Sequence, residues 1–151
     1  MYDIARDFMR RTGNPSQWID GYPSEAFITS EIDAGHSFVC ENQSGVLVGT
    51  LCFIIGEDPT YAHIYEGEWL NHEPYGTVHR IASSGKEKGV AEACFRWCFT
   101  QCPNIRVDTH RDNRVMQRIL EKLGFGYCGI IYIANGTERL AFQRLAEIGE
   151  D

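Results

Sequence analysis

The sequence of 151 residues has the size of a single domain that can bury a hydrophobic core without disulfides or metals. Hydrophobic residues make up 43% of it, and no run approaches the roughly 18 apolar residues that a membrane-spanning helix requires. Fourteen basic and 21 acidic residues give a net charge of -7, which repels nucleic acid and favours cationic partners. These features exclude a helical membrane protein and argue against nucleic-acid binding.

The first residues include acids and lack the basic and apolar segments of a secretory signal, so we expect a cytoplasmic protein. Its six cysteines are then expected to be reduced and mostly buried. Cys94, Cys98 and Cys102 fall on one face of a predicted helix, but no second pair stands at the spacing of a zinc site. Core packing is favoured for these three residues, and no metal is expected.

Two helices are predicted before residue 36. Apolar residues recur at helical spacing from Ile4 to Met9, before Gly13. Ser24 can cap a second helix, and Gly35 follows its last residue. The chain then becomes rich in β-branched and aromatic residues, which favours a series of largely antiparallel strands. The strands predicted in this part span residues 37–40, 46–55, 61–69 and 77–83.

The second half predicts helices that alternate with strands. Pro103 ends the first of these helices, and Asp112 or Asn113 can cap the second, which Gly124 ends. We therefore expect one α+β domain over residues 1–151, with a mixed, mostly antiparallel sheet flanked by helices. The elements of this half are a helix over 90–101, a strand over 105–109, a helix over 115–123, and strands over 127–134 and 139–145.

The segment from Ser83 to Ala91 lies between a predicted strand and a predicted helix, and its small residues let backbone N–H groups approach an anion. It is not a Walker loop, because Arg80 stands where the first glycine is required and Glu87 where serine or threonine is required. The remaining interpretations are a phosphate loop of another kind and a glycine-rich helix start with a purely structural purpose.

Residues 86–91 read Lys-Glu-Lys-Gly-Val-Ala. This segment resembles the coenzyme A loop of the GNAT N-acetyltransferase superfamily: glutamine or arginine, any two residues, glycine, any residue, then glycine or alanine. Lysine takes the first position here. The order of elements from Thr77 to Leu145, with its helix ending in Leu-Gly-Phe at residues 123–125, is also similar to the GNAT core.

The resemblance implies a GNAT-like fold and the transfer of an acetyl group from acetyl-coenzyme A to the amino group of a small molecule, peptide or protein. It also implies a homodimer, which is a common assembly in this family. In the family this loop binds the pyrophosphate, and the strand before it aligns the pantetheine arm. Asn113 matches a position that hydrogen-bonds this arm, but asparagine is also a common helix cap. The residues assigned to the cofactor are Ile81, Ala82, Ser83, Lys86, Glu87, Lys88, Gly89, Val90, Ala91 and Asn113.

Attack by an amine requires its neutral form, and a primary amine like that of lysine has a pKa of about 10.4, so a base is needed near neutral pH. On the predicted strand 61–69, alternation places Glu66 and Glu68 on one face, where two carboxylates could bind and deprotonate a cation. His79 lies on the strand that the resemblance places beside the pantetheine arm, and the ordinary histidine pKa of about 6.5 suits a base. Glu66 and His79 are the leading catalytic candidates. The alternatives are a structural histidine and solvent-exposed glutamates.

Aromatic side chains near these residues either line an acceptor pocket that attracts a cation or form part of the core. Besides Glu68, the residues assigned to the acceptor are Tyr65 and Trp69. Many GNAT members protonate the departing thiolate with a tyrosine in the last helix, where this chain has Leu120. A thiol with a pKa of about 8.5 can leave as the thiolate, and Tyr127 or Tyr132 could serve only if the fold brings one to the site.

Two other functions remain open at this point. The first is a non-catalytic module that binds acyl-coenzyme A, which agrees with the leucine at position 120. The second is a structural α+β interaction domain without a cofactor.

Overall fold

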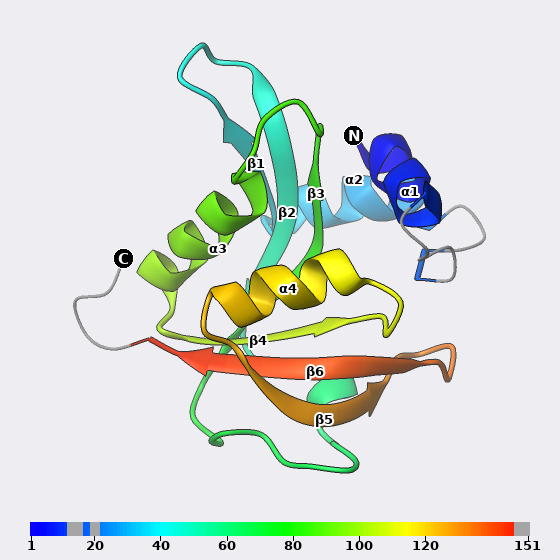
Figure 1. Ribbon diagram of the computed structural model, residues 1–151, viewed down its shortest axis with the longest axis vertical. Coiled ribbons are helices and arrows are strands. Elements are labelled where there is room, and N and C mark those ends of the chain that lie inside the picture. The colour runs from blue at the N-terminus through cyan, green and yellow to red at the C-terminus, as the bar shows by residue number, and fades with distance from the viewer. Residues whose placement is uncertain (12–16, 19–21, 147–151) are drawn as a thin grey trace.

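The computed structural model describes residues 1–11, 17–18 and 22–146 (Figure 1). The helices are α1 (Tyr2–Arg11), α2 (Glu25–Asp33), the short 3-10 helix η1 (Pro59–Tyr61), α3 (Val90–Gln101) and α4 (Arg114–Lys122). The strands are β1 (Ser37–Glu41), β2 (Leu47–Ile55), β3 (Gly76–Ser83), β4 (Asn104–Thr109), β5 (Gly126–Tyr132) and β6 (Glu138–Leu145).

The helix boundaries follow the capping signals in the sequence. The side chain of Ser24 accepts a hydrogen bond from the Phe27 N–H at 3.1 Å, and the Asn113 side chain accepts one from the Met116 N–H at 3.1 Å. Each satisfies a backbone donor that the first turn of its helix leaves unpaired. Helix α3 ends just before Pro103, which cannot continue a helix. The predicted helices and the predicted hairpins are therefore confirmed, whereas the expected end of the first helix at Gly13 lies outside the described residues.

The predicted strand over residues 61–69 is wrong. Within the described residues, its only ladder contact is an isolated bridge between Tyr65 and Ile130. Glu66 has a φ of +56°, in the left-handed region that strand residues do not occupy. The sheet consequently has six strands instead of seven, and Glu66 and Glu68 do not share a strand face.

Burial of aromatic rings explains this difference. Tyr61 and Trp69 belong to a core cluster on one face of the sheet, and Trp69 Nε1 donates a hydrogen bond to the Tyr61 carbonyl at 3.0 Å. The same ring-rich composition that favours strands also favours packing of a loop onto a sheet. The other buried residues of this cluster are Tyr75, Cys128, Ile131 and Ala141.

A buried polar network attaches the loop after η1, residues 62–75, to β4 and β6. Asn104 Nδ2 donates to Asn71 Oδ1 at 2.9 Å, and Gln143 Nε2 donates to Asn104 Oδ1 at 2.8 Å. Gln143 Oε1 accepts a hydrogen bond from the Leu70 N–H at 2.8 Å. These side chains replace ladder hydrogen bonds that an irregular loop cannot form, so the loop backbone is held without becoming a strand.

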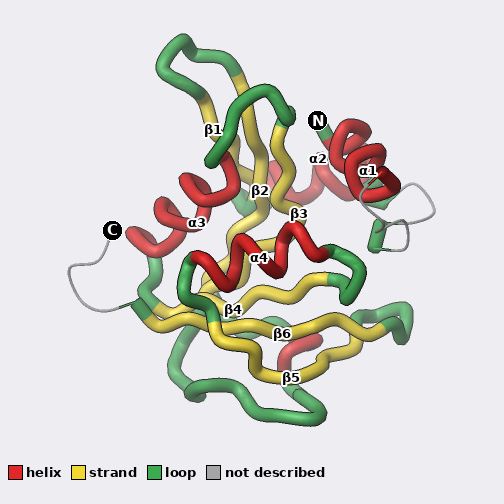
Figure 2. The backbone as a smooth tube through the Cα atoms, in the orientation of Figure 1, coloured by secondary structure: helices red, strands yellow, loops and turns green. Residues whose placement is uncertain are grey.

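The strand order is β1-β2-β3-β4-β6-β5, and every neighbouring pair is antiparallel except β3 and β4. The parallel pair is joined only at Gly76–Ile105 and Thr77–Arg106. Beyond these residues the two strands diverge. In Figure 1, β1, β2 and β3 run steeply while β4, β6 and β5 run across the molecule, and Figure 2 shows the same division.

The larger core cluster packs α3 and α4 against the sheet, and it includes Phe95, Ile105 and Leu120, each 0% exposed. Cys94, Cys98 and Cys102 belong to it, as predicted, and five of the six cysteines are buried. In the part of the chain that the structure describes, no group of three or more metal-ligating side chains comes together. No described helix is both long and apolar enough to cross a membrane.

Gly67 offers a test of the contact between the loop after η1 and β5. A Cβ atom at position 67 would lie 1.9 Å from the Cys128 carbonyl oxygen. We expect Gly67→Ala to lower the free energy of unfolding by about 2 to 4 kcal/mol, because rigid backbone would have to move. Urea unfolding followed by circular dichroism measures this change.

Gly126→Ala is the matched control, since its Cβ would meet its nearest atoms at 3.9 and 4.0 Å, an ordinary contact distance. Equal unfolding midpoints for the two variants would contradict the close approach of loop and strand.

Candidate active site

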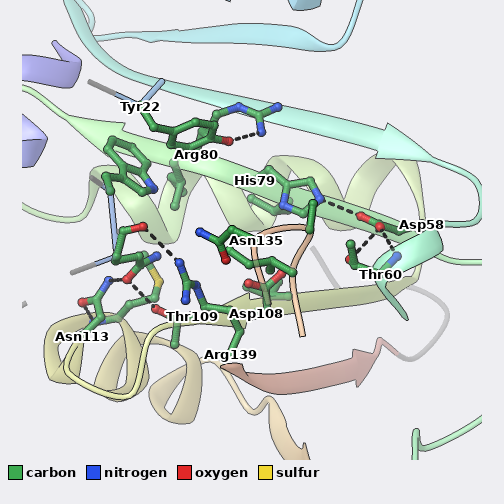
Figure 3. A pocket seen from close by; sticks show the side chains of 18 of the residues that line it. Tyr22, Asp58, Thr60, His79, Arg80, Asp108, Thr109, Asn113, Asn135 and Arg139 are labelled. Atoms are coloured by element: carbon green, nitrogen blue, oxygen red, sulfur yellow. Dashed lines mark hydrogen bonds and ion pairs between the residues drawn. The ribbon is translucent and has the colours of Figure 1, made fainter. Parts of the chain in front are cut away.

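A pocket of about 550 Å³ opens where β3 and β4 diverge (Figure 3). Residues 78–81 of β3 form one wall and residues 107–109 of β4 the other. The η1 segment, the start of α4, the β5–β6 turn and residues from the N-terminal part of the chain complete it. The pocket is therefore built around the strand pair that stops pairing after two residues.

His79 and Asp58 form a hydrogen-bonded pair in this pocket. His79 Nε2 lies 2.9 Å from Asp58 Oδ2. Oδ1 of Asp58 accepts hydrogen bonds from the N–H and the hydroxyl of Thr60, at 2.9 and 2.7 Å. Burial alone would raise the pKa of Asp58, but the hydrogen bonds from His79 and Thr60 prevail and lower it to about 2.

The charge of Asp58 decides which nitrogen of His79 carries the proton. An ionised carboxylate can only accept hydrogen bonds, so Nε2 of His79 must be the donor. In the neutral ring this leaves the lone pair on Nδ1, and the Asp58 contact also orients the ring. A histidine held in one tautomer by a partly buried carboxylate is an arrangement suited to proton transfer.

A second carboxylate lines the pocket from β4. The Tyr61 hydroxyl donates a hydrogen bond to Asp108 Oδ2 at 2.6 Å, and Tyr61 is only 1% exposed. Burial, followed by the charge of Asp108, raises the pKa of Tyr61 well above its ordinary value, so the hydroxyl keeps its proton. Arg139 is nearby and 4% exposed; burial lowers its pKa while Asp108 opposes this effect. Its guanidinium donates to the carbonyls of Glu138 and Gln17 at 2.9 and 3.0 Å.

Strand β3 contains a bulge between His79 and Ala82, where two residues lie opposite one residue of β2. Arg80 in this bulge has a φ of +51°, a conformation that costs a non-glycine residue about 1 to 3 kcal/mol. A bulge leaves an extra residue unpaired in the ladder, so the strand can offer a backbone N–H to a ligand.

Contacts of the Arg80 side chain hold the bulge in place. Its guanidinium donates to the Tyr22 hydroxyl at 2.9 Å, pairs with Glu31 of α2 at 3.4 Å, and lies 4.8 Å from the centre of the Phe27 ring. The contacts with Glu31 and Phe27 tie α2 to the strand at the edge of the pocket. The position of the bulge consequently depends on residues far away in the sequence.

Beyond the bulge, β3 leads into the glycine-containing loop before α3. Gly89 precedes α3 with a φ of +79°, and among the described residues no side chain caps the helix. A Cβ at Gly85 or Gly89 would meet no atom within 4 Å, so the loop is open on that side. An uncapped helix N-terminus with the exposed Lys86 and Lys88 beside it fits a pyrophosphate.

The structure brings some of the predicted site residues together and separates others. His79, Ile81 and Asn113 line the pocket, and the loop from Lys86 to Ala91 follows the same strand. By contrast, the four predicted residues on the loop after η1 are not among the described residues that line it. These residues are Tyr65, Glu66, Glu68 and Trp69.

The surroundings of these four residues explain the separation. Glu66 and Glu68 are exposed, and Tyr65 packs on Tyr132 with ring centres 5.4 Å apart. Trp69 is buried in the core cluster that also contains Tyr61. Tyr127 packs on Phe142, so neither Tyr127 nor Tyr132 takes the place of the tyrosine that Leu120 replaces.

Sequence reasoning missed the acidic partners of the pocket. Asp58 stands before a proline and a threonine, which is the pattern of a residue that caps a turn, and the structure confirms that cap. Asp108 is an acidic residue near the end of β4, whose sequence is Asn-Ile-Arg-Val-Asp-Thr. Both aspartates can be noticed in the sequence, but neither local pattern indicates which residues lie beside them in the fold.

Comparison with solved structures gives the family. A GNAT-family acetyltransferase from Streptococcus agalactiae is 36% identical, with 96% of this chain and 86% of that chain covered and a TM-score of 0.86. A GNAT-family acetyltransferase from Listeria monocytogenes is 20% identical over 95% of this chain and 84% of that chain, with a TM-score of 0.66. A chain of the NatC complex bound to Gag peptide and CoA is 15% identical over 85% of this chain and 86% of that chain, with a TM-score of 0.58. No protein-family model and no curated protein sequence matches.

The protein belongs to the GNAT acetyltransferase family, because 36% identity extends over nearly the whole chain. The predicted resemblance and the predicted α+β fold with a mostly antiparallel sheet are confirmed. Family membership supports acetyl transfer, and hence an acyltransferase. The neighbours that are 20% and 15% identical support the fold alone.

The low pKa of Asp58 predicts a pH-dependent contribution to stability. Because the folded state holds this pKa near 2, below the ordinary value of about 3.9, the contribution is complete above pH 5 and is lost as the pH falls toward 2. We expect Asp58→Asn to cost about 2 kcal/mol of unfolding free energy at pH 7. The cost should diminish below pH 4 in urea unfolding measured across this range.

Glu57→Gln is the control, since Glu57 is the exposed acidic neighbour of Asp58. A cost of Asp58→Asn that stays constant from pH 7 to pH 2.5 would show that the carboxylate charge does not matter.

Proposed function

We propose that the protein is an N-acetyltransferase that transfers the acetyl group of acetyl-coenzyme A to the amino group of a small molecule or peptide. The observation that carries this proposal is the His79–Asp58 pair on the wall of the pocket between β3 and β4. The strand that carries His79 continues into an uncapped helix N-terminus, so a proton acceptor and a phosphate site lie along one chain segment.

The residues present fit the cofactor. The loop from Lys86 to Ala91 would bind the pyrophosphate, and Ile81 to Ser83 would align the pantetheine arm. Acetyl-coenzyme A supplies the thioester carbonyl that the amine attacks. Asn113 caps α4, and its Nδ2 donates to Gln17 Oε1 at 3.1 Å, so it acts beside the arm while also ordering the pocket wall.

His79 takes the proton that the amine must lose before it attacks. Nδ1 accepts this proton, and the carboxylate of Asp58 stabilises the imidazolium that results. Glu66, the other predicted base, lies on a loop outside the pocket, so we assign the step to His79. Overall the ammonium group loses two protons: one passes through His79 to solvent, and the other ends on the coenzyme A sulfur.

The backbone supports the remaining charge changes. Formation of the carbon–nitrogen bond would put negative charge on the thioester oxygen, and a backbone N–H of the β3 bulge would stabilise that charge. The carbon–sulfur bond then breaks and the sulfur leaves as a thiolate. Leu120 is 0% exposed in the core and donates nothing, so departure relies on the thiol pKa of about 8.5 and on water.

The leucine at position 120 also favours a second candidate, a module that binds acyl-coenzyme A without catalysis. Calorimetry with acetyl-coenzyme A, followed by thiol release with a panel of primary amines, separates the two. Binding and thiol release support the transferase, whereas binding without release by any amine supports the module. Absence of binding at micromolar cofactor would overturn both functions and leave an interaction domain.

We expect His79→Gln to lower kcat about 10²- to 10⁴-fold, the usual contribution of a general base, with little effect on cofactor affinity. Steady-state kinetics with the best amine of the panel measure this effect. Glu66→Gln distinguishes the two bases predicted from the sequence: a loss of kcat in Glu66→Gln that His79→Gln does not show would transfer the role.

Reversing the charge of Lys86 and Lys88 tests the phosphate site. We expect Lys86→Glu and Lys88→Glu, alone and together, to weaken acetyl-coenzyme A binding more than acceptor binding, because both positions flank the helix N-terminus. Calorimetry gives the cofactor Kd. Arg96→Glu, an exposed charge reversal within α3, is the control, and an unchanged Kd in the double variant would rule out this placement of the phosphates.

A further inference from the structure

Asp108 has an unused oxygen in the pocket. Oδ2 accepts the hydrogen bond from Tyr61, but in the described part of the chain Oδ1 has neither a hydrogen-bond nor an ion-pair partner. Because Tyr61 is fully buried and packs on Trp69 with ring centres 5.1 Å apart, its hydroxyl fixes the carboxylate in one orientation. A carboxylate held in this way is preorganised to accept one further hydrogen bond.

Among the described residues, none of the other charged groups that line the pocket forms an ion pair with Asp108. Arg80 is paired with Glu31, and Asp58 is engaged by His79. Arg139 donates to backbone carbonyls, and no ion pair joins it to Asp108 among the described residues. Arg80 and Glu31 offset each other, and the two carboxylates of Asp58 and Asp108 outnumber the single guanidinium of Arg139 by one. The pocket is therefore complemented by a ligand that carries one positive charge.

His79 and Asp108 come from the two strands that form the walls of the pocket, β3 and β4 (Figure 3). Tyr61 contacts both residues: its ring centre lies 6.2 Å from that of His79, and its hydroxyl bonds Asp108. A bound amine between the walls would meet the Asp108 carboxylate and the base at the same end of the pocket.

We propose that Asp108 binds the acceptor as an ammonium ion, so that the acceptors are aliphatic amines that are protonated at neutral pH. The inference rests on the proposed acetyltransferase function and names its substrate class. A charge-assisted hydrogen bond to Oδ1 holds the ammonium group until His79 removes its proton. Weakly basic aromatic amines, which are uncharged at neutral pH, gain no such bond and are poor acceptors.

Matched amines test the proposal by binding and by turnover. Benzylamine is protonated at neutral pH, whereas aniline, of similar size, is not. We expect the protein with bound coenzyme A to bind benzylamine more tightly than aniline in NMR titrations. Asp108→Asn should weaken benzylamine binding about 10- to 100-fold, as expected for a charged hydrogen bond, and leave aniline binding unchanged.

In turnover, Asp108→Asn should raise the amine KM by a similar factor, with kcat within about threefold and the acetyl-coenzyme A Kd unchanged. Tyr61→Phe keeps the packed ring but frees the carboxylate, so it should raise the amine KM only several-fold. This second variant keeps the test decisive if Asp108→Asn folds poorly. Glu121→Gln, which removes an exposed charge from α4, is the control.

Equal binding of benzylamine and aniline, or an Asp108→Asn variant with unchanged amine affinity, would overturn the assignment. Failure of the proposed function has a different signature, since the wild-type protein would then bind no acetyl-coenzyme A or release no thiol with any amine. The NMR titration without turnover still decides whether Asp108 selects the ammonium ion.

Discussion

The site depends on one feature of the sheet: β3 and β4 pair at two positions and then diverge. Each strand continues with ladder hydrogen bonds to its other neighbour, β2 or β6, so the separation leaves each strand paired along one edge. The gap exposes backbone and side chains from two walls that are each held in the sheet along the other edge. Groups fixed in this way before a ligand binds are the kind that electrostatic catalysis uses.

Charged side chains that are buried or partly buried hold this opening in shape. The Arg80 guanidinium joins β3 to α2 through Glu31, while the Arg139 guanidinium joins β6 to the N-terminal part of the chain through the Gln17 carbonyl. Asp58 connects η1 to β3, because it caps η1 and also orients His79. Each group is expensive to bury alone, so its partners must be in place before the site is complete. The structural and chemical roles of these residues are therefore inseparable.

Local sequence signals predicted much of the fold. Ser24 and Asn113 cap their helices through contacts three residues away, and Pro103 ends α3 by its own covalent structure. The loop proposed to bind the phosphates could be singled out because its glycines and lysines lie within five consecutive residues, 85–89. The strand expected at 61–69 failed because aromatic composition does not distinguish a ladder from a loop packed onto a sheet. The assignment of Glu66 and Glu68 to a common strand face failed with it.

The sequence by itself determined the helices, the hairpins, the family resemblance and His79 as a candidate base, because these depend on residues close together along the chain. Only the tertiary structure decided that the Asp58 carboxylate pairs with that histidine and that Tyr61 bonds Asp108. Asp58 reaches His79 across 21 positions, and Tyr61 reaches Asp108 across 47. Such pairs are set by how β3 and β4 separate and by where η1 packs. No local pattern encodes them, because side-chain proximity between distant segments exists only once the sheet has formed.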